Sequence, residues 1–143
     1  MALEFLSPLH KASRQISMHL EASTRELGVS PLEGHILTYL RKYGPVPVGE
    51  LVRVFGVKQS TLTSLLDRLE NASLVRREIN RDDRRSFLIH ISDDGRDLTG
   101  RLNRLLESLE DDIRKRVRSV DVKGFHAVMA AVESITQVRL ADR

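Results

Sequence analysis

Cysteine and tryptophan are absent from the 143 residues of the chain, which also holds only four phenylalanines and two tyrosines. The lack of cysteine excludes disulfides, zinc–thiolate sites and thiol-based redox sensing. The scarcity of aromatic residues predicts a mostly aliphatic core. No apolar run approaches the roughly 20 residues that a membrane span needs, and the first residues lack the long uncharged segment of a signal peptide. These absences predict a cytoplasmic protein that does not enter a membrane.

The composition is that of a folded globular domain. Hydrophobic residues make up 41% of the chain and charged residues 30%, and this length is enough for one domain with a real core. The net charge is only +3, but the pI of about 9.6 leaves room for a local basic surface. The position of the charges, rather than their sum, therefore has to indicate the function.

Helical periodicity covers both ends of the chain. An apolar stripe runs up to Leu27, and Ser30 and Glu33 form a capping-box pattern that starts a second helix. Ser92 caps a third, long helix with a leucine seam typical of helix–helix packing. A small core could not cover all the apolar positions of these terminal helices, so we expect a dimerisation surface that includes Phe5, Leu9, Leu105, Leu109, Ile113, Phe125 and Val132.

The middle of the chain predicts a helix-turn-helix. The segment GELVRVFG forms a short helix that turns at Gly56. In the next segment, KQSTLTSLLDRLENASLV, leucines recur on one helical face, and the opposite face carries small polar side chains. Two helices joined by a tight turn with glycine, the second with a polar outer face, have the layout of a helix-turn-helix.

Two short strands follow, LVRREI and SFLIHI, and five consecutive charges, Arg81-Asp82-Asp83-Arg84-Arg85, join them. A hairpin beside a helix-turn-helix is a winged helix. We therefore expect a mainly α fold, a winged helix-turn-helix with a small β-hairpin wing. Residues 30–95 form the DNA-binding region, and residues 1–29 and 96–143 form flanking helical dimerisation regions.

The polar helix face and the hairpin tip suit double-stranded DNA. Short hydrogen-bonding side chains fit base edges and phosphates in a major groove, and arginines on a narrow hairpin can enter a minor groove. Asp83 would repel phosphate, so we expect it to hold a neighbouring arginine, from the wing or Arg68, by a charge-assisted hydrogen bond. The expected DNA-binding residues are Gln59, Ser60, Thr61, Thr63, Ser64, Arg68, Arg81, Asp83, Arg84 and Arg85.

The segment DDRRSFLIHISDDG resembles the wing signature of the MarR (multiple antibiotic resistance regulator) family of bacterial transcription factors. That signature is Asp-x-Arg, five residues, Leu-Thr, two residues and Gly, which here is Asp83, Arg85, Ile91, Ser92 and Gly95. STLT and LLDRLE are similar to the family's helix-turn-helix. The resemblance implies a homodimer, acting as a repressor on a pseudo-palindromic operator, with one recognition helix per protomer in the major groove and the wing arginines in the flanking minor groove.

Several positions depart from the family pattern. Pro47 and Lys58 stand where the family usually has Ser or Thr caps, and Val52 replaces an alanine at a helix contact. Ser73 replaces a glycine after the recognition helix, where a left-handed C-cap becomes less easy. Ser64 stands where a basic residue is frequent. These departures affect the expected strength and sequence preference of DNA binding rather than the fold.

The resemblance also implies a small aromatic or anionic effector bound between the dimerisation helices and the winged helix. Candidate lining residues are His10, Arg14, His19, His35 and Tyr39. His35 and Tyr39 lie one helical turn apart, and this spacing is equally compatible with a half-buried interface.

Five scattered histidines do not make a metal site. The chain has no phosphate-binding glycine loop, no HExxH and no nucleophile–base spacing. The sequence thus predicts no catalytic residue, no metal, no cofactor and no enzyme activity. One alternative function stays open, a winged helix whose arginines bind an acidic protein partner. DNA recognition would require a preferred duplex sequence, whereas an acidic partner would not.

Overall fold

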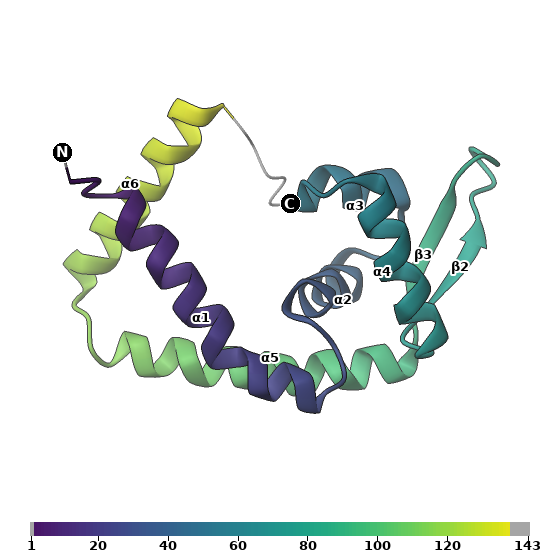
Figure 1. Cartoon of the computed structure of the whole chain (residues 1–143), viewed down its shortest axis with the longest axis horizontal. Helices are drawn as coiled ribbons and strands as arrows, with labels where there is room; N and C mark the ends of the chain where they lie inside the picture. Colours follow the sequence, from purple (N-terminus) through teal and green to yellow (C-terminus); the bar gives the residue numbers. More distant parts are fainter. Residues whose placement is uncertain (1, 138–143) are drawn as a thin grey trace.

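The predicted mainly α winged-helix fold is confirmed by a computed structural model, which describes residues 2–137 (Figure 1). Residues 138–143 of the expected C-terminal helical region lie outside the described residues. The elements are α1 (Leu6–Glu26), α2 (Pro31–Tyr43), β1 (Val46–Pro47), α3 (Val48–Phe55), α4 (Gln59–Asn71), β2 (Val75–Ile79), β3 (Phe87–Ile91), α5 (Asp93–Arg114) and α6 (Ser119–Thr136). The long helix α5 connects the winged helix, at one end of the molecule, to α6 at the other.

Two helix starts form as the sequence predicts. The Ser30 hydroxyl accepts the Glu33 backbone N–H at 3.2 Å, and the Glu33 carboxylate accepts the Ser30 N–H at 3.4 Å, which completes the capping box of α2. At α5, the Ser92 hydroxyl accepts the Gly95 N–H at 3.0 Å. These side chains satisfy N–H groups that have no partner inside the helix.

The departures at Pro47 and Lys58 leave α3 and α4 without a side-chain hydrogen bond at their N-caps. At the end of α4, Ser73 takes the left-handed conformation (φ +61°) that the usual glycine would take. Its N–H reaches the Glu70 carbonyl, and the Leu74 N–H reaches the Leu69 carbonyl, both at 2.9 Å. This pattern is a Schellman motif, so the chain follows the expected path despite the serine.

The wing belongs to a three-stranded antiparallel sheet of order β1-β3-β2. The hairpin of β2 and β3 confirms the prediction, with Arg77 opposite Ile89 and Ile79 opposite Phe87. The third strand, β1, was not predicted from the sequence, because two residues are too few to show a periodicity. It pairs with β3 and leads directly into α3, so this pairing links the wing to the helices.

The core is aliphatic, as the composition predicts, and it lies inside the winged helix. Its fully buried hydrophobic side chains come from α2, α3, α4 and β3: Ile36, Leu37, Leu40, Leu51, Leu62, Leu66, Leu69 and Ile89. The leucine face predicted for α4 is therefore confirmed. This packing fixes the direction in which the polar face of α4 points.

The terminal helices bury much less. In α5, Leu98 and Leu102 are buried, Leu109 is half-buried and Ile113 is 45% exposed. Within the described part of the chain, no residue of α6 is buried, and Phe125 is 55% exposed. No helix of residues 2–137 is long and apolar enough to cross a membrane. The apolar faces of the terminal helices thus extend beyond what the chain itself covers.

Candidate nucleic-acid interface

The polar face of α4 is exposed, as expected. Gln59, Ser60, Thr61, Thr63 and Ser64 all point away from the leucine core. The Thr63 hydroxyl donates to the Gln59 carbonyl at 2.9 Å, and the Ser64 hydroxyl donates to the Ser60 carbonyl at 3.1 Å. These intrahelical bonds orient the hydroxyl oxygens while leaving their lone pairs available as acceptors.

The tip of the hairpin carries three exposed arginines, Arg81, Arg84 and Arg85. Asp83 organises the turn: its carboxylate accepts the Arg85 backbone N–H at 3.1 Å, and its carbonyl accepts the Ser86 N–H at 3.0 Å. Among the described residues, Asp83 forms no ion pair. Asp83 therefore shapes the backbone of the tip, rather than holding an arginine side chain as we expected.

Arg68 is held by another carboxylate. Its guanidinium lies 3.0 Å from the carboxylate of Glu33, whose side chain is only 8% exposed. The sequence pattern placed Arg68 on the outer face of α4 but did not reveal this partner on α2. Glu33 thus fixes one edge of α4.

Arg77, on β2, is the residue of this region that sequence reasoning missed. Its guanidinium lies 2.7 Å from the Asp67 carboxylate and 3.3 Å from that of Glu70, both on α4, and its backbone N–H donates to Glu70 at 3.2 Å. The side chain is 21% exposed. A signal was present: in the alternation of β2, Arg77 lies on the same face as buried Val75, where an arginine needs a partner.

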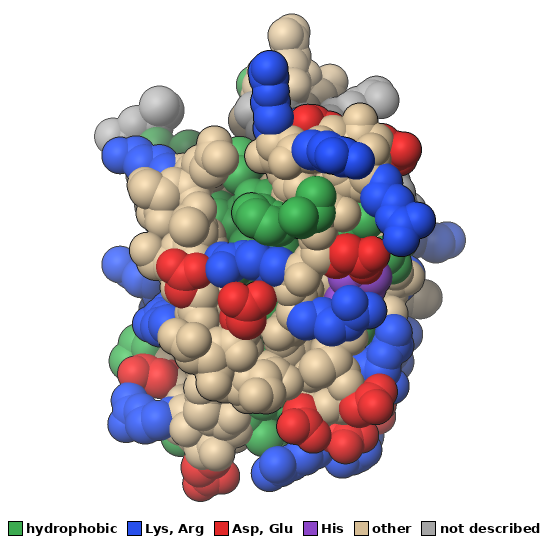
Figure 2. Space-filling view, turned by 90° about the vertical axis from the view of Figure 1, so that its right-hand side faces the viewer, with side chains coloured by type: hydrophobic (Ala, Val, Ile, Leu, Met, Phe, Trp, Pro, Cys, Tyr) green, Lys and Arg blue, Asp and Glu red, His purple; other side chains and the backbone are tan. Residues whose placement is uncertain are grey.

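A groove separates α4 from the wing. It is lined by residues of α3, α4, β2 and the hairpin up to the start of β3, including Val52, Arg53, Gln59, Thr63, Arg85 and Phe87. Figure 2 shows this end of the molecule, where a hydrophobic patch lies between basic side chains and a cluster of mixed charge. Gln59 and Thr63 of α4 and Arg85 of the hairpin thus line one groove, and the other expected DNA-binding residues lie outside its lining.

The expected effector residues lie on two helices, α1 and α2. His10, Arg14, His19 and His35 are exposed, and His19 lines a shallow groove between α1 and α5. Half-buried Tyr39 lies in α2, where its hydroxyl donates to Glu50 at 3.2 Å and its ring packs on Tyr43 and Phe55.

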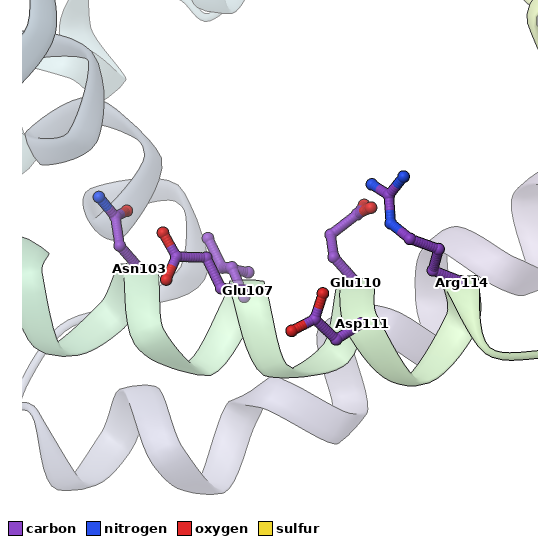
Figure 3. A pocket seen from close by; sticks show the side chains of 6 residues that line it. Asn103, Glu107, Glu110, Asp111 and Arg114 are labelled. Atoms are coloured by element: carbon purple, nitrogen blue, oxygen red, sulfur yellow. The ribbon is translucent and has the colours of Figure 1, made fainter.

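Carboxylates on α5 do not form a metal site. Glu107, Glu110 and Asp111 project from successive turns of this one helix, beside Asn103 and Arg114 (Figure 3). Among residues 2–137, no group of three or more His, Asp or Glu side chains is arranged to hold a metal ion.

The chain is similar to known regulators in sequence. Residues 29–87 match the model of the MarR family. The chain is 30% identical to the HTH-type transcriptional regulator PecS of Dickeya dadantii over 131 residues, which cover 90% of this chain and 79% of PecS. It is 33% identical to the HTH-type transcriptional repressor MdtR of Bacillus subtilis over 82 residues, but that match spans only 53% of MdtR and 57% of this chain.

Solved structures share the fold. The MepR–DNA complex of S. aureus superposes with a TM-score of 0.85 at 16% identity, covering 93% of this chain and 98% of MepR. A mutant of MarR from E. coli, complexed with operator DNA, gives a TM-score of 0.81 at 21% identity, covering 91% of this chain and 94% of that one. With the fold, the family model and the PecS match in agreement, the chain belongs to the MarR family, whose members are transcriptional regulators and not enzymes.

Proposed function

We propose that the protein is a homodimeric, sequence-specific DNA-binding transcriptional regulator that acts as a repressor in the cytoplasm. The observation that carries this proposal is one groove between α4 and the wing, lined by Gln59 and Thr63 of the exposed polar face of α4 and by Arg85 of the wing tip. The relatives support it, because PecS and MdtR are named as a regulator and a repressor, and MepR and MarR were crystallised with DNA.

Each element has a defined role in the proposed complex. The short polar side chains of α4 (Gln59, Ser60, Thr61, Thr63 and Ser64) contact base edges and phosphates in the major groove. Arg85, with Arg81 and Arg84, enters or lines the flanking minor groove. Asp83 shapes the turn that presents them, and Arg68 contacts phosphate from the edge held by Glu33. Residues 30–95 form this DNA-binding region.

Dimerisation joins two such regions. The apolar side chains that one protomer leaves exposed or half-buried on α1, α5 and α6 supply the interface, and they include Phe5, Leu9, Leu105, Leu109, Ile113, Phe125 and Val132. A two-fold axis between the protomers would place the recognition helices about 34–36 Å apart, one turn of DNA, on a pseudo-palindromic operator.

A small aromatic or anionic effector would release the DNA by changing that spacing. Its site includes His10, Arg14, His19, His35 and Tyr39, between the terminal helices and the winged helix. Tyr39 already has partners in α2 and α3, so an effector that recruits it must rearrange that cluster.

A fluorescence anisotropy titration tests the proposed function. The purified protein is titrated into the duplex upstream of its own gene and into a scrambled duplex of equal composition, each at two salt concentrations. We expect binding to the native duplex to be tighter by about a thousandfold or more and to persist at the higher salt. Equally weak binding to both duplexes that disappears with salt would contradict recognition of this operator, and a screen of acidic protein partners would follow.

A further inference from the structure

The outer face of the β2–β3 hairpin carries a histidine between two opposite charges. His90 of β3 lies opposite Arg76 of β2, and Glu78 follows Arg76 on the same face of that strand. The His90 Nδ1 lies 3.3 Å from a guanidinium nitrogen of Arg76, and its Nε2 lies 2.7 Å from a carboxylate oxygen of Glu78. One imidazole thus contacts a cation through one ring nitrogen and an anion through the other.

The imidazole is well covered, and these two side chains are the charged groups that face it. The side chain of His90 is 19% exposed, whereas those of Arg76 and Glu78 are 63% and 44% exposed. The strand β1 and the helices α2 and α3 also pack against β3. Among residues 2–137, however, no other carboxylate lies within 4.0 Å of a ring nitrogen, and no other side chain forms a hydrogen bond with the ring.

The contact with Arg76 requires a neutral imidazole. A guanidinium donates hydrogen bonds and cannot accept them, so Nδ1 must carry no proton when it binds Arg76, and the proton of the neutral ring lies on Nε2. Nε2 is buried and has no hydrogen-bond partner, although the Glu78 oxygen is only 2.7 Å away. A buried N–H without an acceptor is costly. The neutral arrangement therefore satisfies one ring nitrogen at the expense of the other.

Protonation of the ring reverses this preference. The charged imidazolium has a proton on both nitrogens, so it can no longer accept from Arg76. Its positive charge also repels the guanidinium and attracts the Glu78 carboxylate, which is already close enough for an Nε2–H hydrogen bond after a small rotation. Histidine is the side chain that ordinarily changes its charge near neutral pH. Acidification should thus exchange the contact with Arg76 for a hydrogen bond to Glu78.

We propose that His90 is a pH-responsive switch in the wing: the neutral ring holds Arg76, and the protonated ring binds Glu78, releases Arg76 and adds one positive charge to the hairpin. The effect of this charge on DNA rests on the proposed function, whereas the exchange of partners does not. One added charge about 10 Å from a phosphate strengthens binding about twofold in water. The two wings of the proposed dimer should then give about fourfold tighter binding in acid.

The first experiment follows the exchange of partners without DNA. Two-bond ¹H–¹⁵N spectra identify the protonated ring nitrogens of His90, and the Arg76 side-chain signals are assigned by their loss in Arg76→Gln. At about pH 8 we expect the Nε2–H tautomer, and towards about pH 5.5 the Arg76 signals should shift together with those of the ring. An Nδ1–H tautomer at the higher pH, or Arg76 signals that do not follow the charge of the ring, would overturn the switch.

The second experiment measures duplex binding by fluorescence anisotropy at the same two pH values and at constant ionic strength. His90→Gln is the test variant, because its amide can accept from Arg76 and donate to Glu78 but does not titrate. The control is His126→Gln, at an exposed position of α6. Circular dichroism at both pH values confirms that the variants are folded.

The ratio of the affinities in acid and in base should be about fourfold larger for the wild type and His126→Gln than for His90→Gln. Equal ratios in the wild type and His90→Gln would overturn the effect of the switch on DNA. Wild-type binding without preference for the duplex upstream of its own gene, at both pH values, would instead contradict the proposed function. The spectra of the free protein distinguish the two failures, because they do not depend on DNA.

Discussion

The guanidinium of Arg68 on α4 lies 3.0 Å from the carboxylate of Glu33 at the start of α2. The same carboxylate accepts the Ser30 N–H, and its side chain is only 8% exposed. One acidic side chain therefore caps a helix of the core and also holds the edge of the helix proposed to enter DNA. Its removal should affect both stability and binding.

Glu33→Ala should lower the free energy of unfolding by about 1–2 kcal/mol, because α2 loses half of its capping box and Arg68 loses its partner. Urea denaturation measures this change. Glu26→Ala, at the exposed end of α1, is the control and should change stability by less than about 0.5 kcal/mol. Equal stability of the two variants would contradict the dual role of Glu33.

Arg85→Ala should weaken operator binding by about 1–3 kcal/mol if Arg85 makes a specific groove contact. The wing turn itself should persist, because the Asp83 carboxylate accepts the backbone N–H of residue 85 and not its side chain. Anisotropy titrations with the operator and with a scrambled duplex separate specific from general loss. An unchanged affinity for the operator would exclude Arg85 from the interface.

Leu109→Glu should disrupt dimerisation first and DNA affinity only as a consequence. Leu109 is half-buried in one protomer and lines the groove between α1 and α5. A charge there would have to be desolvated in a closed interface. Sedimentation velocity over a range of concentrations measures the dissociation constant, and Arg104→Glu, at an exposed position of the same helix, is the comparison. A stable Leu109→Glu dimer with full DNA affinity would rule out this seam.

Ser73→Gly should stabilise the protein by about 1 kcal/mol, because Ser73 occupies the left-handed region, which costs residues other than glycine about 1–2 kcal/mol. The backbone bonds of the Schellman motif do not depend on its side chain. Ala72→Gly, one residue earlier at φ −81°, should instead be destabilising. Thermal and urea unfolding measure the stability of both variants. A less stable Ser73→Gly variant and a more stable Ala72→Gly variant would be inconsistent with a strained cap.

Local patterns in the sequence predicted most of the fold. Capping residues such as Ser30 and Ser92, the leucine face of α4 and the alternation of β3 each act within a few residues, so sequence spacing is enough to find them. The strand β1 was not predicted, because it has only two residues and depends on pairing with β3, which lies far along the chain beyond the helix-turn-helix.

The ionic contacts of the candidate site could not be predicted to the same extent. Arg68 pairs with Glu33 and Arg77 with Asp67 only because packing brings α2, α4 and β2 together. Asp83 was expected to hold a neighbouring arginine side chain, but its carboxylate instead accepts the backbone N–H of Arg85, two residues on, in an Asx turn. Arg77 could have been suspected from its place on the inner face of β2, although its partners could not.

The contacts of Arg77 have a consequence for how the proposed dimer could vary. Since β2 is joined to α4 by ion pairs inside the chain, we expect α4 and the wing to keep one mutual geometry. A tilt of α5 would then change the number of base pairs between two half-sites and leave the preferred bases within each half-site unchanged. For the proposed dimer, we therefore expect spacer length and base preference to be independent properties, the first set by the terminal helices and the second by α4 and the wing.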